Sequence, residues 1–359
     1  MPPLNDIHHM LSALALARRG LGRTWPNPSV GCVIVNKSGQ VVGRGVTGDG
    51  GRPHAETIAL KQAGTEAKGG CVYVSLEPCA HHGETPPCTD SLIKSGVKRV
   101  VLTSEDKDSR VAGKGIKLLR DAGIEVEAGV LAEEAYEINQ GFNLRVTENR
   151  PLVTIKSATS SDYKIAEKAR TRTQITGERS MMRAQLERSQ HDVVLVGINT
   201  VLTDDPLLTS RLPGHDHDIV RVVLDSNLRI PVDCQLVKTA SQHPLWVIHK
   251  EGESADLEKA GAKLLQTDPK NAREVLKLLA QEGITRLLIE GGAKVSTAFL
   301  EAGFCDRFLH FQAPTEIGND GVDALMGHSI ADLEQDFGLK RQKTSSYGED
   351  FLAIYTCEA

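Results

Sequence analysis

Pro53-His54-Ala55-Glu56 is one of two stretches that decide the fold; the other runs Glu77-Pro78-Cys79-Ala80-His81-His82-Gly83-Glu84-Thr85-Pro86-Pro87-Cys88. The imidazole of His54 and the thiolates of Cys79 and Cys88 are ligands of the right softness for Zn²⁺. Three protein ligands leave the fourth tetrahedral position open for a water, as in catalytic zinc sites. Glu56 is not needed as a ligand, so we expect it to move a proton from that water to a leaving group. The pattern predicts hydrolytic deamination.

Both stretches are expected at helix starts. Helices beginning at His54 and at Pro78-Cys79 would turn their positive ends toward a thiolate, so both could converge on one zinc. A lone His-x-Glu is common by chance, and most free cysteines are buried apolar residues. The ordered combination favours zinc. His81 and His82 remain rival ligands.

Strands and helices alternate around these stretches. The first half is expected to hold a hairpin over residues 29–35 and 40–43, strands over 71–76, 97–103 and 124–128, and helices near 7–17, 55–63, 115–122 and 131–140, with residues 78–95 as a loop entering a helix. This alternation predicts a mixed or parallel sheet covered by helices, with ligands at the ends of strands.

The second half repeats the alternation. We expect strands over residues 152–156, 193–196, 220–224, 245–248 and 286–289, and helices over 178–189, 272–281 and 294–301. A chain of 359 residues is more than one core usually accommodates. We therefore expect a second α/β domain that begins near Thr147.

Composition limits the location and the partners. The chain is 40% hydrophobic and 25% charged, with a net charge of -5, which argues against general affinity for nucleic acid or anionic membranes. Its seven cysteines are irregularly spread, unlike a disulfide framework. With no leader-like N-terminus and no run of apolar residues long enough for a span, we expect a cytoplasmic protein.

Three segments resemble the bifunctional riboflavin biosynthesis deaminase-reductases: residues 24–35, the Pro-His-Ala-Glu motif, and the stretch from Glu77 to Cys88. The eight-residue spacer between the cysteines is the most telling, because cytidine, guanine and tRNA adenosine deaminases carry a shorter Pro-Cys-x-x-Cys. The resemblance implies a cytidine-deaminase-like three-layer α/β/α domain over residues 1–146. This domain would use Zn²⁺ to deaminate 2,5-diamino-6-(5-phosphoribosylamino)pyrimidin-4(3H)-one, with Asn27 on the pyrimidine.

The second half resembles the reductase half of the same family. The similar segments are residues 197–209, Val223-Leu224-Asp225-Ser226 and Leu288-Ile289-Glu290-Gly291-Gly292-Ala293. They imply a dihydrofolate-reductase-like α/β domain over residues 147–359 that uses NADPH to reduce a ribosyl group to ribityl. A strand that ends in Glu-Gly-Gly and opens a helix presents amide donors to a dinucleotide phosphate.

The resemblance also implies the binding residues of this half. The cofactor would be bound by Thr159, Gln174, Thr200, Asp204, Ser226, Gly292, Ala293, Lys294, Val295, Ser296, Thr297 and Ala298. The phosphoribosyl substrate would be bound by Arg172, Arg188, Leu208, Arg211 and Glu290. Guanidinium groups suit this role because their planar forks match phosphate oxygens.

Two residues depart from the family pattern in the reductase half. Tyr163 stands where the family has glycine, and Gln174 stands where it has a tryptophan that lines the cofactor site. Glycine supplies backbone freedom that tyrosine resists, and an aromatic wall supplies stacking area that glutamine lacks.

Three interpretations remain open. The chain is a bifunctional enzyme, or an active deaminase whose degenerate reductase half serves assembly or substrate handling, or a binding module with a structural zinc. The resemblance implies a homo-oligomer acting on a small-molecule pyrimidine nucleotide.

Overall fold

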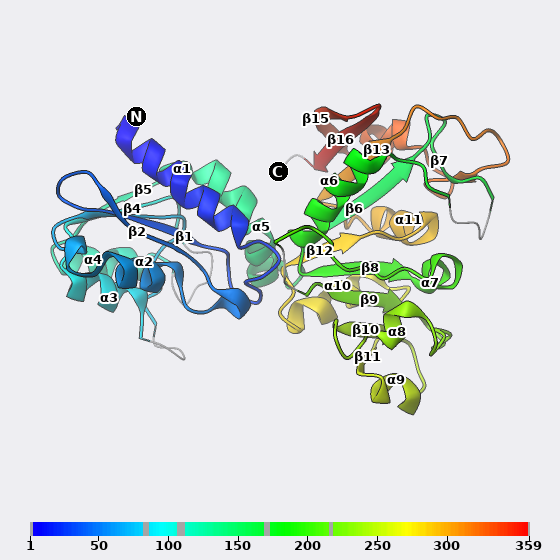
Figure 1. Ribbon diagram of the computed structural model, residues 1–359, viewed down its shortest axis with the longest axis horizontal. Coiled ribbons are helices and arrows are strands. Elements are labelled where there is room, and N and C mark those ends of the chain that lie inside the picture. The colour runs from blue at the N-terminus through cyan, green and yellow to red at the C-terminus, as the bar shows by residue number, and fades with distance from the viewer. Residues whose placement is uncertain (1–2, 82–85, 106–111, 169–172, 215–217, 358–359) are drawn as a thin grey trace. The chain divides into compact units, whose positions relative to one another are not determined.

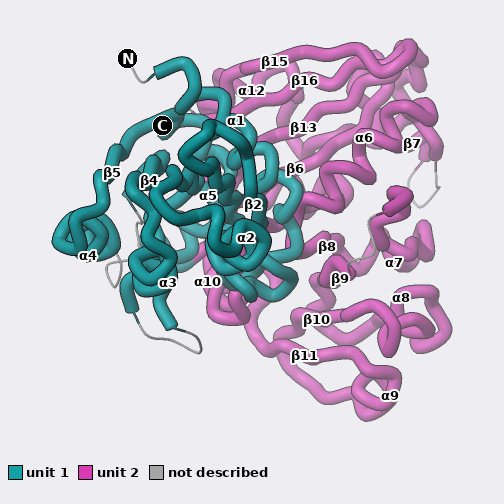
Figure 2. Tube along the Cα trace, turned by 60° about the vertical axis from the view of Figure 1, so that its left-hand side comes forward, with its two compact units in different colours: residues 1–149 teal, residues 150–359 magenta. Residues whose placement is uncertain are grey.

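The computed structural model describes residues 3–81, 86–105, 112–168, 173–214 and 218–357. Its contacts divide the chain into two units, residues 1–149 (unit 1) and 150–359 (unit 2), which are coloured separately in Figure 2. The predicted division between residues 146 and 147 falls inside helix α5 (Ala132–Glu148). This helix continues to Glu148 and is followed by Asn149, whose backbone is left-handed with φ 54°.

Unit 1 is built on a five-stranded mixed sheet (Figure 1). Its order is β2-β1-β3-β4-β5, in which β1 pairs antiparallel with β2 and β3, whereas β3, β4 and β5 run parallel. The strands are β1 (Gly31–Val35), β2 (Val41–Val46), β3 (Cys71–Val74), β4 (Arg99–Leu102) and β5 (Glu125–Ala128). The expected hairpin and the expected mixed sheet are both present.

Helices cover both faces of this sheet. One apolar core joins the sheet to α2 (Ala55–Ala63), α3 (Cys88–Ser95) and α4 (Lys114–Asp121) through side chains such as Ala59, Leu92 and Leu119. A second core on the other face joins it to α1 (Leu4–Arg19) and α5 through Leu14 and Ile138. Unit 1 therefore has three layers.

Two glycines of β2 bring α2 close to the sheet. A Cβ at Gly43 would lie 2.3 Å from the carbonyl oxygen of Ala59, and one at Gly45 would lie 2.1 Å from that of Ala55. Both glycines lie on the same face of the strand, because side chains alternate along a strand. The start of α2, where His54 and Glu56 lie, is thereby fixed against the sheet.

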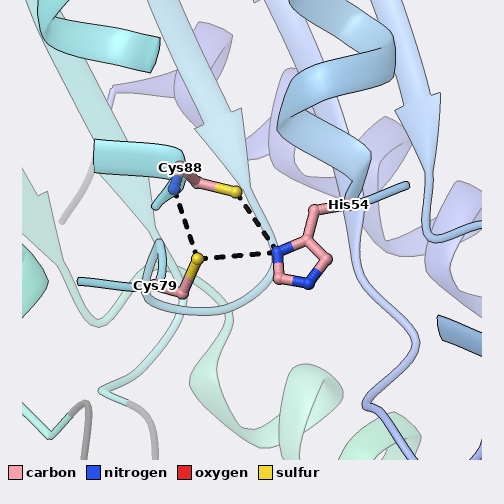
Figure 3. Close-up of side chains that lie close together, drawn as sticks. All are labelled: His54, Cys79 and Cys88. Carbon is pink, nitrogen blue, oxygen red and sulfur yellow. Dashed lines mark hydrogen bonds between the residues drawn. The ribbon is translucent and has the colours of Figure 1, made fainter. Parts of the chain in front are cut away.

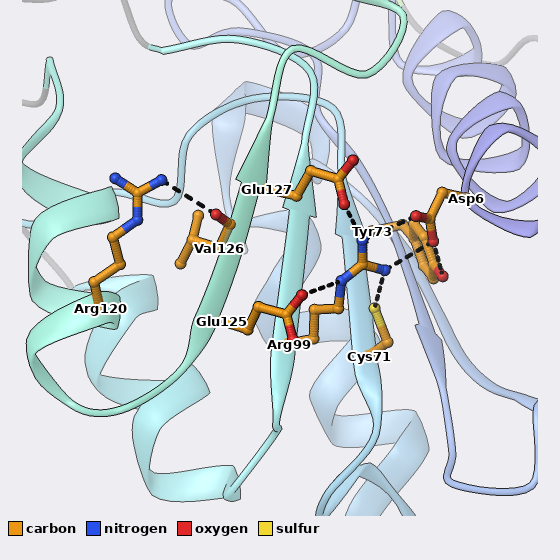
Figure 4. Close-up of polar contacts among 8 residues, drawn as sticks. All are labelled: Asp6, Cys71, Tyr73, Arg99, Arg120, Glu125, Val126 and Glu127. Carbon is orange, nitrogen blue, oxygen red and sulfur yellow. Dashed lines mark hydrogen bonds and ion pairs between the residues drawn. The ribbon is translucent and has the colours of Figure 1, made fainter. Parts of the chain in front are cut away.

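A charged cluster ties α1 to the sheet of unit 1 (Figure 4). Arg99 of β4 donates to both oxygens of the buried Asp6 at 2.9 Å, and Tyr73 donates its hydroxyl to Asp6 at 2.7 Å. Glu125 and Glu127 of β5 complete the set of carboxylates around Arg99. Asp6 thus lies in the first turn of α1 and makes a tertiary contact with the sheet.

Unit 2 is built on a nine-stranded sheet of order β11-β10-β9-β8-β12-β6-β13-β16-β15. All strands from β11 through β10, β9, β8, β12 and β6 to β13 run parallel to their neighbours. Strand β16 pairs antiparallel with β13, and β15 pairs antiparallel with β16 at the end of the sheet. These strands are β6 (Leu152–Thr159), β8 (Val193–Gly197), β9 (Val220–Leu224), β10 (Leu245–His249), β11 (Ala262–Gln266), β12 (Arg286–Ile289), β13 (Arg307–Gln312), β15 (Leu339–Tyr347) and β16 (Asp350–Cys357). A separate pair joins β7 (Lys164–Ala166) to β14 (Val322–Asp323).

The helices of unit 2 lie between these strands along the chain. They are α6 (Glu178–Ser189), α7 (Ile198–Asp204), α8 (Gln235–Lys238), α9 (Ala255–Lys259), α10 (Ala272–Gln281), α11 (Ala293–Glu301) and α12 (Leu333–Phe337). Helices α6 and α10 have the predicted bounds, and α11 begins one residue earlier than expected. Across the described ranges, no helix is both long and apolar enough to span a membrane.

Candidate functional site

Three side chains of unit 1 converge at one point (Figure 3). Nδ1 of His54 lies 3.3 Å from Sγ of Cys88 and 3.5 Å from Sγ of Cys79, and the three ligand atoms all lie within 4.8 Å of one another. Tetrahedral zinc, with bonds of about 2.0–2.1 Å to nitrogen and 2.3 Å to sulfur, would separate such atoms by about 3.6 Å. The ligand set and its spacing therefore fit Zn²⁺.

The local structure explains how the three ligands meet. His54 is the residue before α2, Cys88 is the first residue of α3, and Cys79 lies in the segment that follows β3. The expectation that a helix starts at Pro78-Cys79 is wrong, because the helix begins at Cys88. The N-terminus of α3 nevertheless contacts Cys79, since the backbone N–H of Cys88 donates a hydrogen bond to the Cys79 sulfur at 3.2 Å.

The ionisation of the ligands reflects this convergence. A hydrogen bond from the Cys88 thiol, followed by the neighbouring His54, lowers the pKa of Cys79 to about 4. The same hydrogen bond to Cys79, together with burial, raises the pKa of Cys88. The hydrogen bond to Cys79 also raises the pKa of His54.

Glu56 lies near these ligands without joining them. Its side chain is buried, and it is not one of the residues whose ligand atoms cluster. Burial, and then the nearby Cys79, raise the pKa of Glu56. A buried carboxylate with a raised pKa is suited to accept and release a proton during a reaction.

The other residues predicted for unit 1 are placed as follows. Asn27 donates its side-chain amide to the carbonyl of Gly51 at 3.2 Å, and a Cβ on Gly51 would meet that amide at 2.1 Å. The rival ligand His81 is not in the cluster of ligand atoms, and His82 lies outside the described residues.

The residues predicted for the cofactor gather at one edge of the sheet of unit 2. Thr159 ends β6, Thr200 and Asp204 belong to the helix after β8, Ser226 follows β9, and Gly292 follows β12. These four strands are neighbours in the order β9-β8-β12-β6 and run parallel. Their carboxyl ends therefore share an edge, where ligands of open α/β sheets bind.

A glycine cradle lies at this edge. A Cβ at Gly197 or Gly291 would come within 2.9 or 2.8 Å of Val295, so both glycines are needed for the start of α11 to pack there. A Cβ on Gly292 would meet nothing within 4 Å. Helix α11 thus begins next to open space, where its first amides can meet an anionic dinucleotide.

The predicted run from Gly292 to Ala298 is unequal in exposure. Ser296 and Thr297 are buried, and the Thr297 hydroxyl accepts the backbone N–H of Met326 at 2.8 Å. Lys294 and Ala298 are exposed, and Ala293 and Val295 are partly buried. Only the beginning of this run lies at the open cradle.

Thr159 and Gln174 lie in different surroundings. Thr159 is buried, and its hydroxyl lies 2.8 Å from Nε2 of His310. Gln174 is exposed and lines a cavity of about 520 Å³ together with the start of α6 and the turn between β15 and β16.

Arg188 and Glu290, both predicted to hold the substrate, are paired with each other. Arg188 donates to both carboxylate oxygens of Glu290, at 2.9 and 2.8 Å, and to the carbonyl of Thr209 at 2.8 Å. Burial would raise the pKa of Glu290, but attraction and hydrogen bonds from Arg188 outweigh it and lower the pKa. The Arg188 guanidinium is thus largely occupied within unit 2.

The remaining predicted substrate residues are separate from this pair. Leu208 is buried with a left-handed φ of 57°, and Arg211 is exposed, with its backbone N–H bonded to the side chain of Gln185. Arg172 lies outside the described residues.

Sequence reasoning missed some residues that shape these sites. Gly43 and Gly45 allow α2 to approach the sheet, and the repeated small residue in β2 was the available signal. Lys156 on β6 is a lysine in an apolar strand; burial lowers its pKa, and attraction to Glu290 opposes that shift.

A His-Cys-Cys cluster whose geometry fits zinc in one unit, and a parallel sheet with a glycine-rich carboxyl edge in the other, are typical of one class of protein, the zinc-dependent deaminases joined to a reductase. Residues 4–104 match the family model for the cytidine and deoxycytidylate deaminase zinc-binding region, and residues 151–353 match that for the RibD C-terminal domain. The chain belongs to the RibD family of riboflavin biosynthesis proteins.

Several relatives match nearly the whole chain. The riboflavin biosynthesis protein RibD of Aquifex aeolicus is 40% identical and aligns over 98% of each chain, and that of Escherichia coli is 36% identical over 92% of this chain and 95% of its own. The solved structure of Acinetobacter baumannii RibD has a TM-score of 0.88 at 35% identity and covers 99% of both chains. That of the Thermotoga maritima deaminase and reductase has the same TM-score at 32% identity, again over 99% of both chains.

These matches confirm the family, the fold class and the two activities expected from the sequence. The chain is a bifunctional deaminase and reductase that acts on a small-molecule pyrimidine. Zn²⁺ and NADPH are its cofactors.

Proposed function

We propose that His54, Cys79 and Cys88 hold the zinc of the deaminase and that Glu56 is its general acid and base. The substrate of this step is 2,5-diamino-6-(5-phosphoribosylamino)pyrimidin-4(3H)-one. The observation that carries this assignment is the convergence of Nδ1 of His54 with the two sulfurs, beside a buried carboxylate. When bound, zinc activates water as a Lewis acid.

Glu56 has two successive roles in this proposal. Its carboxylate takes a proton as water becomes nucleophilic, and it then delivers the proton to the departing amine. Asn27, held by Gly51, orients the pyrimidine. Among the described residues, no fourth His, Cys, Asp or Glu joins the three ligands, which favours a catalytic zinc over a structural one.

We propose that residues at the carboxyl edge of the unit 2 sheet bind the reductase ligands. Thr200, Asp204, Ser226 and the start of α11 at Gly292 bind NADPH, which supplies the hydride that converts the ribosyl group to ribityl. Arg211 and the Arg188–Glu290 pair border the phosphoribosyl substrate. The glycine cradle before α11 is the main support, because it leaves room for a phosphate beside backbone amides.

We further propose that unit 1 carries the deaminase and unit 2 the reductase, and that the enzyme works in the cytoplasm as a homo-oligomer without binding nucleic acid. The matched segments 4–104 and 151–353 support the division of labour. The net charge of -5 and the scattered cysteines support the location and the lack of nucleic-acid binding.

The deaminase assignment is tested with Glu56→Gln in the zinc-loaded protein. Ammonia release from the diaminopyrimidine nucleotide should fall by at least about a hundredfold, since proton transfer by a positioned side chain contributes roughly that much. Zinc content should stay unchanged. Glu133→Gln, a change on the surface of α5, is the matched control. Full turnover by Glu56→Gln would refute the proposed role.

The reductase assignment is tested with Gly292→Val. An added Cβ meets nothing within 4 Å in the folded protein, so the stability of unit 2 should hold, while the valine side chain obstructs the access of NADPH to the amides of α11. The KM for NADPH should rise, whereas ammonia release by the same sample should not change. An unchanged KM for NADPH in the Gly292→Val protein would refute the placement of the cofactor at the start of α11.

A further inference from the structure

Backbone N–H groups at the start of α4 donate to the side chain of Glu77. One carboxylate oxygen accepts the N–H of Gly115 at 2.8 Å and that of Ile116 at 3.2 Å, and the other accepts the N–H of Gly113 at 2.9 Å. Glu77 is buried, with 4% of its surface exposed. A buried carboxylate is thus matched by three donors from one helix end.

These contacts replace a cap that α4 lacks. The residue before the helix is Gly113, whose backbone is left-handed and which has no side chain to accept the first amides. The first amides of a helix need acceptors, and a negative charge is favoured there by the helix dipole. Glu77 supplies both from a segment 36 residues earlier in the chain.

The backbone after Glu77 is also pressed against α4. A Cβ at Gly115 would lie only 2.2 Å from the carbonyl oxygen of Pro78. Glycine is therefore required at this position for Pro78 to reach its place. The side chain of Glu77 and the backbone of Pro78 together fix the chain immediately before Cys79.

On its other side, Cys79 is held by α3. The hydroxyl and the backbone N–H of Thr89 donate to the carbonyl of Cys79 at 3.2 and 3.3 Å, and the N–H of Cys88 donates to its sulfur. The ligand Cys79 is not itself in a helix. Its position depends on the two helices that hold its flanks.

We infer that Glu77 is a positioning residue of the deaminase site, which sets the place of the ligand Cys79 by anchoring its segment to the N-terminus of α4. This inference rests on the proposed zinc site. Without the hydrogen bonds between Glu77 and α4, Pro78 can move away from this helix. The sulfur of Cys79, two residues beyond Glu77, then moves with it. Outer groups of this kind hold metal ligands in their binding geometry.

The test uses the full-length protein with Glu77→Gln and, separately, Gly115→Ala. The Glu77→Gln side chain would keep one acceptor oxygen but turn an N–H₂ group toward a backbone donor. The methyl group added by Gly115→Ala would push the Pro78 carbonyl away, although alanine is the better helix former. The zinc dissociation constant is measured by competition with a chromophoric chelator. Cobalt-substituted protein reports the ligand geometry through its thiolate-to-metal absorption.

Both variants should bind zinc about 10- to 100-fold more weakly than the wild type, as is typical when groups supporting a ligand are lost. Their cobalt spectra should shift. The matched control is Asp6→Asn, which removes a buried carboxylate of unit 1 that contacts Arg99 and Tyr73. It should lower stability without changing the zinc affinity or the cobalt spectrum.

Wild-type zinc affinity and cobalt spectra in the Glu77→Gln and Gly115→Ala proteins would overturn the inference, and Glu77 would then only stabilise α4. If Glu77→Gln does not fold, the result of Gly115→Ala decides. Failure of the wild-type protein itself to bind zinc through Cys79 and Cys88 would instead refute the zinc site, so the two failures are distinguishable.

Discussion

Arg188 and Glu290 form a two-bonded ion pair in the interior of unit 2, with Nε–Oε1 and Nη2–Oε2 distances of 2.9 and 2.8 Å. Their side chains are only 10% and 12% exposed. We predict that Glu290→Gln lowers the free energy of unfolding of unit 2 by about 3 kcal/mol, because a buried guanidinium is left without its counter-charge. Denaturant unfolding of the wild type and the variant measures the difference.

The control for this prediction removes both charges. The double variant Arg188→Met with Glu290→Gln should recover part of the lost stability, because no buried guanidinium remains. Recovery should be incomplete, since Lys156 is also attracted to Glu290 and loses that carboxylate. A single variant as stable as the wild type would show that the pair contributes nothing in solution.

Tyr163 occupies a backbone conformation that favours glycine, with φ 62°. Its ring lies 5.8 Å from that of His310, so replacing tyrosine also removes packing. Two variants separate these effects. Tyr163→Gly and Tyr163→Ala both lose the ring, but only glycine relieves the left-handed strain, so the glycine variant should be the more stable of the two by about 1 kcal/mol.

The opposite order is expected where the backbone is helical. Tyr136 is exposed on α5, and there the alanine variant should be more stable than the glycine variant by about 1 kcal/mol. Midpoints of chemical unfolding give both comparisons. If alanine is also preferred at position 163, Tyr163 does not carry backbone strain.

The cluster of His54, Cys79 and Cys88 could be predicted from the sequence, whereas the partners of several other residues could not. These three residues can be recognised from their chemistry and their order along the chain, and neither depends on knowing the fold. The sequence predicts a helix start at Pro78-Cys79, because proline is favourable in a first helical turn, whereas the helix begins at Cys88.

Long-range pairing explains the other differences. The pairing of Arg188 with Glu290 joins residues that lie 102 positions apart in the chain, so no local pattern in the sequence indicates it. The strands β13, β15 and β16 were not expected either, since their stability depends on pairing with each other and with β6. The left-handed backbone at Tyr163 is indicated in the sequence only indirectly, because the family pattern has glycine at this position.

Asp6 makes the stability of unit 1 dependent on acid pH. Hydrogen bonds from Arg99 lower its pKa despite burial, and Tyr73 adds to the effect. A lowered folded-state pKa means that the stabilisation is present above the unfolded value of about 4 and is lost as pH falls through the folded value. Wild-type unit 1 should therefore lose more stability between about pH 5 and about pH 3 than Asp6→Asn does.

The measurement for Asp6 is made on chelator-treated protein, so that protonation of the zinc ligands does not contribute. At neutral pH, Asp6→Asn should cost about 2 kcal/mol, as for hydrogen bonds to a charged group. Parallel pH profiles of the two proteins would contradict the assigned role of Asp6.

Removal of zinc should destabilise unit 1 selectively. A metal that binds only the folded state adds stability that grows with its concentration, about 2.7 kcal/mol when free zinc is about one hundred times its dissociation constant. Chelation should lower the unfolding temperature of unit 1 and leave that of unit 2 unchanged. Cys88→Ser should abolish the response because it removes a ligand, whereas Cys71→Ser should keep it, since Cys71 lies in the same unit but outside the ligand cluster. An equal response of both units to chelation would argue that the metal acts elsewhere.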